Sequence, residues 1–203
     1  MTGLLASFAE RFAGIRKPVL FGAAAAIQVA LLGAMIADRT QILRGGTEVK
    51  LLTRPIDPRD LLRGDYVVLG YDISQLPSGA LLKQPSASRN PVVYVKLAPK
   101  PDGLYEAVSV HTTAVPVTGP EVLIRGRVTY GASCEPDGLS FCDKLQIRYN
   151  LEKYFVPQGE GRKPEDARNQ RRLTVVAAVL PSGRAAIKRL LLDGEPVYEE
   201  SWF

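Results

Sequence analysis

The sequence contains one histidine and two cysteines among its 203 residues, and this shortage excludes several kinds of site. The single imidazole, His111, does not support a His-rich metal centre. It also argues against a Ser-His-Asp triad unless His111 itself serves, and it lies in the strand-like stretch SVHTTAV. A zinc site would need further Cys or His ligands. The glycine patterns that bind nucleotide phosphates and the ligand spacing of an EF-hand are absent, so we expect no metal and no cofactor.

Aromatic residues are also missing from the densest basic patch, ARNQRR, at residues 167–172. The formal net charge of +5 is compatible with nucleic-acid binding, but proteins that bind single strands interleave aromatic residues with their cations. No recognition-helix pattern lies beside the patch. We therefore predict no nucleic-acid partner, and we interpret the patch as a solvated loop or a contact to an anionic membrane surface.

One long apolar run is present, PVLFGAAAAIQVALLGAMIA, at residues 18–37, with Gln28 as its one strongly polar member. At about 1.5 Å per residue, such a helix crosses a hydrocarbon core of roughly 30 Å. We predict an amino-terminal tail over residues 1–17, a transmembrane helix over 18–37 and a charged helical stem over 38–45. Two alternatives stay open: a cleaved signal peptide, for which Ala34 and Ala37 would supply the small-residue cleavage site, and a buried core helix.

The orientation of this span follows from its flanks and from the two cysteines. Arg11, Arg16 and Lys17 form a compact positive cluster before the span, which favours a cytoplasmic amino terminus. Cys134 and Cys142 flank a Pro-Asp-Gly turn that brings two extended arms together, and we predict a disulfide between them. The alternative is two unrelated small core residues. A disulfide is typical of an oxidising compartment, so the following domain is expected in the periplasm or another extracytoplasmic space.

After residue 45 the chain consists of short β-branched or alternating runs separated by Pro, Gly, Asn or Asp. Nine runs predict strands, at residues 48–53, 65–71, 91–97, 104–110, 121–130, 145–149, 173–180, 185–192 and 196–200. In KPEDARNQRR, Pro164 in the first turn and the acids behind it predict a short helix. We expect a mainly β protein, with one domain over residues 46–203 built as a mostly antiparallel sheet, sandwich or partly closed barrel.

The stretch DPRDLLRGDYVVLGYDIS, residues 57–74, joins a charged turn to an alternating strand. Asp57 and Asp60 can cap turns through their side chains, and Gly64 can adopt a backbone conformation closed to other residues. Asp65 can accept backbone N–H bonds that hold the turn. Turn formation explains these residues without catalysis. The alternative is a ligand or partner site, for which Gly64, Asp65, Tyr66, Leu69 and Tyr71 are the candidate binding residues.

The strand that follows this turn has apolar residues on both faces. With period two, Tyr66 and Val68 face one side, while Val67, Leu69 and Tyr71 face the other. Such a pattern predicts a strand near the middle of a sheet.

The sequence GDYVVLGY resembles the defining motif of the bacterial GDYXXLXY protein family. The fixed positions of that motif are filled by Gly64, Asp65, Tyr66, Leu69 and Tyr71. The similarity continues through IRYNLEKYFVPQGEG and SGRAAIKRLLLDGEPVYEE, although Gln158 stands where glutamate is expected. The resemblance implies a membrane-anchored protein of the bacterial cell envelope, often accompanied by multi-pass membrane proteins, with no established activity.

A more distant outline similarity connects DPRDLLRGDYVVL and IKRLLLDGEPV to type I signal peptidases, which would place Lys188 at the general-base position. Pro55 occupies the place of that family's serine nucleophile, and proline has no hydroxyl group. We therefore predict an accessory or interaction module of the inner membrane rather than an enzyme. The alternative is a membrane-tethered hydrolase with a non-standard active site, for which Lys188, Asp57 and Asp60 are the catalytic candidates.

Overall fold

The computed structural model describes residues 17–56, 66–77, 91–130, 144–157 and 162–200. The chain divides into two compact units, Met1–Thr40 and Gln41–Phe203. The second unit carries all the described strands and the candidate site, so it is the part that bears on function.

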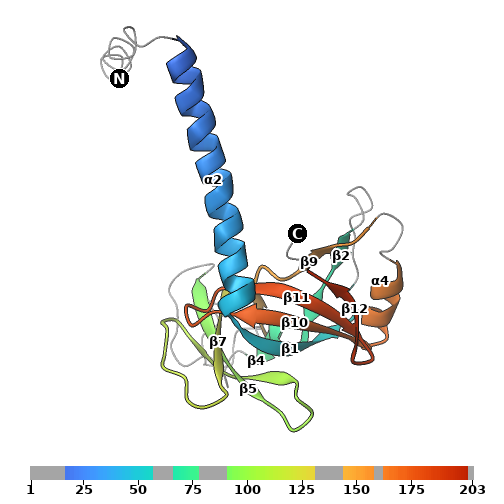
Figure 1. The fold of residues 1–203 in the computed structure, drawn as a ribbon. Coiled ribbons are helices and arrows are strands. Elements are labelled where there is room, and N and C mark those ends of the chain that lie inside the picture. Colours follow the sequence, from blue (N-terminus) through green and yellow to red (C-terminus); the bar gives the residue numbers. More distant parts are fainter. Residues whose placement is uncertain (1–16, 57–65, 78–90, 131–143, 158–161, 201–203) are drawn as a thin grey trace. The chain divides into compact units, whose positions relative to one another are not determined.

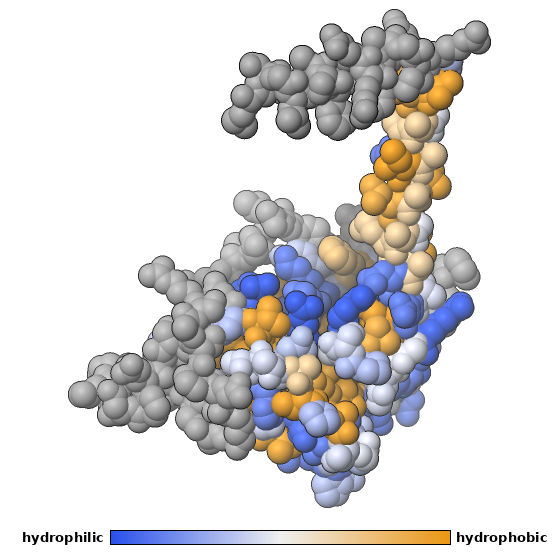
Figure 2. Space-filling model, turned by 90° about the vertical axis from the view of Figure 1, so that its left-hand side faces the viewer, coloured by the Kyte–Doolittle hydropathy of each residue, from blue (hydrophilic) through white to orange (hydrophobic). Residues whose placement is uncertain are grey.

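Helix α2 (Lys17–Gly45) contains the apolar run. It is long and apolar enough to cross a membrane by length and composition, a property that membrane anchors and signal sequences share. Hydrophobic residues predominate on the face of its apolar run that Figure 2 shows, and the most hydrophobic 18-residue window is 0% buried. A buried core helix, the second alternative from the sequence, is therefore not what the structure contains.

The helix continues through the predicted stem, and its last turn belongs to the second unit. Ile42 and Leu43 are buried there in a small cluster with Ala178 and Ala186. The backbone N–H of Gly46 donates to the Ile42 carbonyl at 3.0 Å. A Cβ atom at Gly46 would lie 2.7 Å from the backbone nitrogen of Val179, so glycine permits the close approach that ends the helix against the sheet.

The strands of the second unit pair antiparallel (Figure 1). They are β1 (Thr47–Arg54), β2 (Tyr66–Val68), β3 (Gly70–Tyr71), β4 (Gln75–Pro77), β5 (Val92–Pro99), β6 (Tyr105–His111), β7 (Val122–Tyr130), β8 (Lys144–Arg148), β9 (Lys153–Phe155), β10 (Leu173–Val179), β11 (Ala185–Leu192) and β12 (Glu195–Glu199). A 3-10 turn, η1 (Asp72–Ser74), separates β3 from β4, and helix α4 (Arg162–Asn169) precedes β10.

These strands form a nearly closed, barrel-like arrangement. Within the described residues there are two five-stranded sheets, ordered β12-β11-β10-β1-β3 and β4-β8-β7-β5-β6, and a two-stranded ribbon of β2 and β9. An isolated bridge between Lys50 and Leu104 joins β1 to the start of β6 and so connects the two larger sheets. Helix α4 packs against β1, β2 and β10.

The core fills the space between the sheets because the strands alternate in burial. Strands β5 and β8 bury every second residue, which places one face inside and leaves the other in solvent. Strand β10 is buried on nearly every residue, since the last turn of α2 covers its outer face at Ala178. The polar Thr53 is fully buried but satisfied, because its hydroxyl donates to the Leu173 carbonyl at 2.6 Å.

The mainly β fold, the nine predicted strands and the short helix are confirmed. Two strands of three residues each, β4 and β9, were not predicted. The predicted strand at 65–71 is divided at Leu69 into β2 and β3. The expectation that it lies near the middle of a sheet is wrong, because β3 lies at the end of one sheet and β2 pairs in the ribbon with β9.

Candidate functional site

The described half of the GDYVVLGY motif lies where the β2–β9 ribbon meets β3. Val67, Leu69 and Tyr71 point into the core and are at most 1% exposed, whereas Tyr66 and Val68 are half-buried. The predicted alternation of faces is therefore confirmed. The backbone N–H of Leu69 donates to the Glu152 carbonyl at 2.8 Å, which continues the ribbon's pairing past the end of β2.

Two buried tyrosines tie the motif to the segment between β8 and β9. The Tyr71 hydroxyl donates to the Leu151 carbonyl at 2.5 Å, and the Tyr149 hydroxyl donates to the Ile73 carbonyl at 2.7 Å. Burial raises the pKa of both phenols well above the ordinary value, and the nearby Glu152 carboxylate adds to the rise. Both hydroxyls therefore stay protonated and act as permanent donors. We call this reciprocal pair the tyrosine brace.

Local features of β7 and of the β8–β9 turn shape this segment. Asn150 has a positive φ of 61°, a conformation that asparagine tolerates better than most residues and that reverses the chain here. The Glu152 carboxylate accepts the backbone N–H of Tyr149 at 2.6 Å and holds the turn closed. On β7, a Cβ atom at Gly126 would lie 3.0 Å from the Tyr149 ring. Because glycine has no Cβ atom, the ring can pack closely against the backbone of β7.

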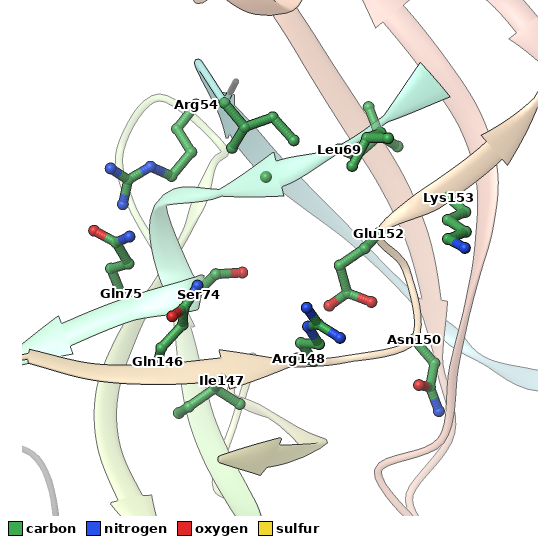
Figure 3. Close-up of a pocket in the computed structure, with 13 residues that line it drawn as sticks. Arg54, Leu69, Ser74, Gln75, Gln146, Ile147, Arg148, Asn150, Glu152 and Lys153 are labelled. Atoms are coloured by element: carbon green, nitrogen blue, oxygen red, sulfur yellow. The ribbon is translucent and has the colours of Figure 1, made fainter. Parts of the chain in front are cut away.

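A pocket of about 580 Å³ opens beside the motif strand (Figure 3). Its lining residues come from three parts of the chain, within residues 54–56, 68–75 and 146–153. Gly70 lies in the wall, and a Cβ atom there would lie 2.6 Å from Ile56 and 3.1 Å from Arg54, so both side chains approach the glycine backbone. The volume lies in the range of small-molecule binding sites.

Charged side chains of mainly one sign line this pocket. Arg54, Arg148 and Lys153 contribute three positive charges, and Glu152 is the one carboxylate among the described lining residues, which gives a formal sum of +2 from +3 and −1. In Figure 3 the Glu152 and Arg148 side chains extend from the wall toward the middle of the pocket. Within the described part of the chain, neither Arg54 nor Arg148 forms an ion pair.

Ser74, at the end of η1, also lines the pocket. Its Oγ atom is buried and has no hydrogen-bond partner, the one side-chain atom of that kind in the described residues. Buried hydroxyl groups without a partner are rare, since each loses its hydrogen bonds to water.

Arg168 of helix α4 fixes the two pocket segments on either side of residues 57–65. It is 1% exposed, and its Nη1 atom donates to the Val68 carbonyl at 2.6 Å, while Nη2 donates to the Ile56 carbonyl at 3.3 Å. Burial lowers the pKa of this guanidinium, and Glu165 partly opposes that effect. The interpretation of ARNQRR as a solvated patch is therefore wrong for Arg168, whose hydrogen bonds to buried carbonyls compensate for the lost water.

Lys188, the general-base candidate, lies outside this pocket on β11, in the same five-stranded sheet as Arg54 and Gly70 of the pocket wall. Its Nζ atom forms an ion pair with Glu48 at 2.7 Å, and the neighbouring Arg189 binds the same carboxylate. Strand β11 contains a bulge at this point: Ile187 pairs with Ala177 and Arg189 with Val176, so Lys188 is the extra residue between them, and two consecutive side chains reach one carboxylate. The hydrogen bond from Lys188 lowers the pKa of Glu48, which keeps the pair ionised.

The other predicted site residues divide into two groups. Tyr66, Leu69 and Tyr71 come together around the pocket, the ribbon and the brace, as described above. Asp57, Asp60, Gly64, Asp65, Cys134 and Cys142 lie outside the described residues, so the turn chemistry and the disulfide stay predictions. Among the described residues no group of three or more His, Cys, Asp or Glu side chains gathers in a way that could hold a metal ion.

The chain matches the family described as "GDYXXLXY protein" over residues 28–190. It belongs to that family. The match includes the end of α2, the motif, the tyrosine brace and every described residue that lines the pocket. Neither a curated protein nor a solved structure matches this GDYXXLXY protein.

Sequence reasoning missed the pocket of this GDYXXLXY domain, although it identified two of the segments that form it. The motif and IRYNLEKY were both singled out by family resemblance, and each supplies part of the wall. Ser74 and Gln75 carry no signal in the sequence, because a single serine after a strand is common. Tyr149 and Tyr71 could have been suspected as a pair only from knowledge of the sheet register.

Proposed function

We propose that this GDYXXLXY protein is a single-pass accessory module of the bacterial inner membrane whose periplasmic β-domain binds another membrane protein. The observation that carries this proposal is an exposed aromatic surface on the motif ribbon. We call it the ribbon face, and it consists of Tyr66 and Val68 on β2 and of Lys153 and Phe155 on β9. In the register of the ribbon, Tyr66 lies opposite Phe155 and Val68 lies opposite Lys153.

The ribbon face exposes a large apolar side chain that does not contribute to the hydrophobic core. Phe155 is 77% exposed, although the ribbon already buries Val67 and Tyr154 on its other face. The rings of Tyr66 and Phe155 are tilted against each other with centroids 6.1 Å apart, and Lys153 Nζ lies 5.2 Å from the Tyr66 centroid. Aromatic side chains of this kind, with a cation beside them, are typical anchors of protein interfaces.

The strand pairing of the ribbon also favours a binding role. In the described residues β2 and β9 pair with each other and with no third strand. On β2 the Val68 carbonyl already accepts a hydrogen bond from Arg168, so β9 is the strand whose outer backbone N–H and C=O groups a partner strand could pair with. Side-chain and backbone contacts would then act together at the ribbon face.

The membrane location and the kind of partner have separate support. Helix α2 has the length and composition of a membrane span, and the basic cluster before it favours a cytoplasmic amino terminus. The predicted disulfide favours a periplasmic domain. The family resemblance implies multi-pass membrane proteins as companions, which is why we expect such a protein as the partner.

Purification of the tagged full-length protein from detergent, followed by mass spectrometry, tests the proposal. We compare the parent with Phe155→Ala and with Tyr130→Ala, which removes another exposed aromatic residue, 57% exposed, from a different sheet. Recovery of a multi-pass membrane protein with the parent and with Tyr130→Ala, but not with Phe155→Ala, is the expected result. Equal recovery with Phe155→Ala, or no partner in several detergents, contradicts it.

The hydrolase alternative has less support from the described geometry. Ser74 is a hydroxyl in the pocket, but no base lies within hydrogen-bond distance of its Oγ atom among the described residues. Lys188 does not line the pocket and is paired with Glu48. A serine nucleophile needs a base that accepts its proton, so these residues do not form a Ser/Lys dyad.

A further inference from the structure

The pocket beside the motif has the charge of an anion-binding site. Arg54 enters its wall from β1, and Arg148 and Lys153 enter it from the consecutive strands β8 and β9, about 95 residues later in the chain. Glu152 leaves a formal excess of two positive charges, and its Oε1 atom already accepts the Tyr149 N–H. Arginine side chains without a carboxylate partner are well suited to bind phosphate oxygens, and a phosphate monoester carries close to two negative charges at neutral pH.

The remaining polar groups of the pocket suit hydroxyl groups. Gln75, Gln146 and Asn150 carry amides that both donate and accept hydrogen bonds, as sugar or glycerol hydroxyls do. The volume of about 580 Å³ is larger than a lone phosphate requires and fits a molecule of about sugar size.

We infer that this pocket binds a phosphate group carried on a small hydroxyl-rich molecule. An anionic phosphate beside hydroxyl groups occurs in a free sugar phosphate, which is a monoester, and in the glycerol head group of an anionic phospholipid, which is a diester with one negative charge, so the test separates these two sources. Val68 and Lys153 belong to both the ribbon face and the pocket wall, but the inference does not rest on the proposed partner, because ligand binding is measured on the purified protein and the substituted residues, Arg148 and Glu152, lie outside the ribbon face.

Calorimetric titration of the full-length protein in phosphatidylcholine nanodiscs tests whether the pocket binds a free sugar phosphate. We expect glucose 6-phosphate to bind, and we expect glucose, which has the same hydroxyl groups without the phosphate, not to bind. Arg148→Gln should weaken binding roughly tenfold, since it removes a charged hydrogen-bond donor that is exposed and not needed for the core. Lys144→Gln is the matched control, because it removes one charge from the same strand outside the pocket.

Glu152→Gln should change the affinity for glucose 6-phosphate in the opposite direction to Arg148→Gln. The amide oxygen of glutamine can still accept the Tyr149 N–H, while the negative charge in the pocket is removed. Binding of glucose 6-phosphate should therefore strengthen about fivefold. Thermal unfolding of each variant confirms that the fold is retained.

Nanodiscs that contain phosphatidylglycerol test whether the head group of an anionic phospholipid occupies the pocket. If the head group is the ligand, the Tm of the protein rises in these nanodiscs relative to phosphatidylcholine nanodiscs, Arg148→Gln abolishes the rise, and Lys144→Gln preserves it. If the free molecule is the ligand, only the titration responds to Arg148→Gln. Absence of both responses, or equal effects of Arg148→Gln and Lys144→Gln, overturns the inference.

Discussion

Tyr71 and Tyr149 each donate to a carbonyl two residues away from the other tyrosine, so the brace joins two segments about 80 residues apart through two nearly equivalent bonds. The last fixed residue of the family motif thus has a structural role, since Tyr71 is fully buried and its hydroxyl is satisfied inside the domain. Tyr66, in contrast, remains half-exposed on the ribbon face. One motif therefore supplies both a core contact and a surface contact.

Tyr71→Phe should lower the free energy of unfolding by about 1 to 2 kcal/mol at pH 7, because the Leu151 carbonyl loses its donor. Burial raises the pKa of Tyr71 in the folded state, whereas in the unfolded chain it is about 10. The parent therefore keeps this stability below about pH 10 and loses it as the pH rises further, because only the unfolded tyrosine ionises. The gap between parent and variant should narrow between about pH 10 and 11.

Urea unfolding at several pH values measures this gap. Tyr130→Phe is the control, since that side chain is 57% exposed and its hydroxyl is not part of the brace, so the substitution should leave the free energy of unfolding nearly unchanged. A gap that stays constant or widens above about pH 10 would show that Tyr71 is not buried as described.

Ser74→Ala should raise the free energy of unfolding by about 1 kcal/mol, because it removes a buried hydroxyl that has no partner in the described residues. Ser109→Ala is the matched control: Ser109 is buried but its hydroxyl is 2.8 Å from His111 Nε2, so its loss should destabilise the protein. Denaturant unfolding compares the two. Equal destabilisation by both substitutions would mean that Ser74 has a structural partner.

At the scale of elements, β7 and β8 support the brace because Gly126 of β7 has no side chain and so leaves room for Ile147 of β8 and for the Tyr149 ring. Gly126→Ala should destabilise the protein by about 1 to 3 kcal/mol, because the added Cβ atom would press on Ile147 and on the Tyr149 ring. Adding Ile147→Ala frees part of that space, so the double variant should lose less stability than the sum of the two single changes. Strict additivity in denaturant unfolding would refute the packing described for Gly126.

Strands with clear alternation were predictable from the sequence, and the pocket was not. Runs such as VVYVKLA keep period two over a whole strand, so their type and burial follow from side-chain pattern alone. The three-residue strands β4 and β9 are too short for such a pattern, and β4 contains Pro77. Arg168 was misinterpreted because its neighbours are charged, although its partners are backbone carbonyls of residues about 100 positions away.

The residues that line the pocket come together only through the register in which distant strands pair, and the amino-acid composition does not determine that register. Its wall needs Arg54, Ser74 and Arg148 from segments that meet only after β1, β4 and β8 take their places in the sheets. Each of these residues is unremarkable in its own segment. Their shared position follows from long-range pairing, and that is the part of the structure that one sequence does not reveal.

At the scale of the whole molecule, the side of the membrane on which the β-domain lies can be tested. Reporter fusions after residue 37 and at the carboxyl end should be active only as extracytoplasmic reporters, because the span is expected to leave the β-domain outside. In the same cells, Cys134 and Cys142 should resist thiol labelling unless a reductant is added. Fusions active only as cytoplasmic reporters, or two freely reactive thiols, would refute this topology.

The pairing of β1 with β10 also fixes the order in which the domain can be completed. Thr53 donates to the carbonyl of Leu173, a residue 120 positions later, and β1 has its longest ladder with β10. At a synthesis rate of about 5 to 20 residues per second, the first strand of the domain waits roughly 10 seconds for its main partner. During that interval the apolar face of β1, with Val49 and Leu51, has no β10 to pair with, so a chaperone or a slow passage through a translocation channel would protect it from aggregation.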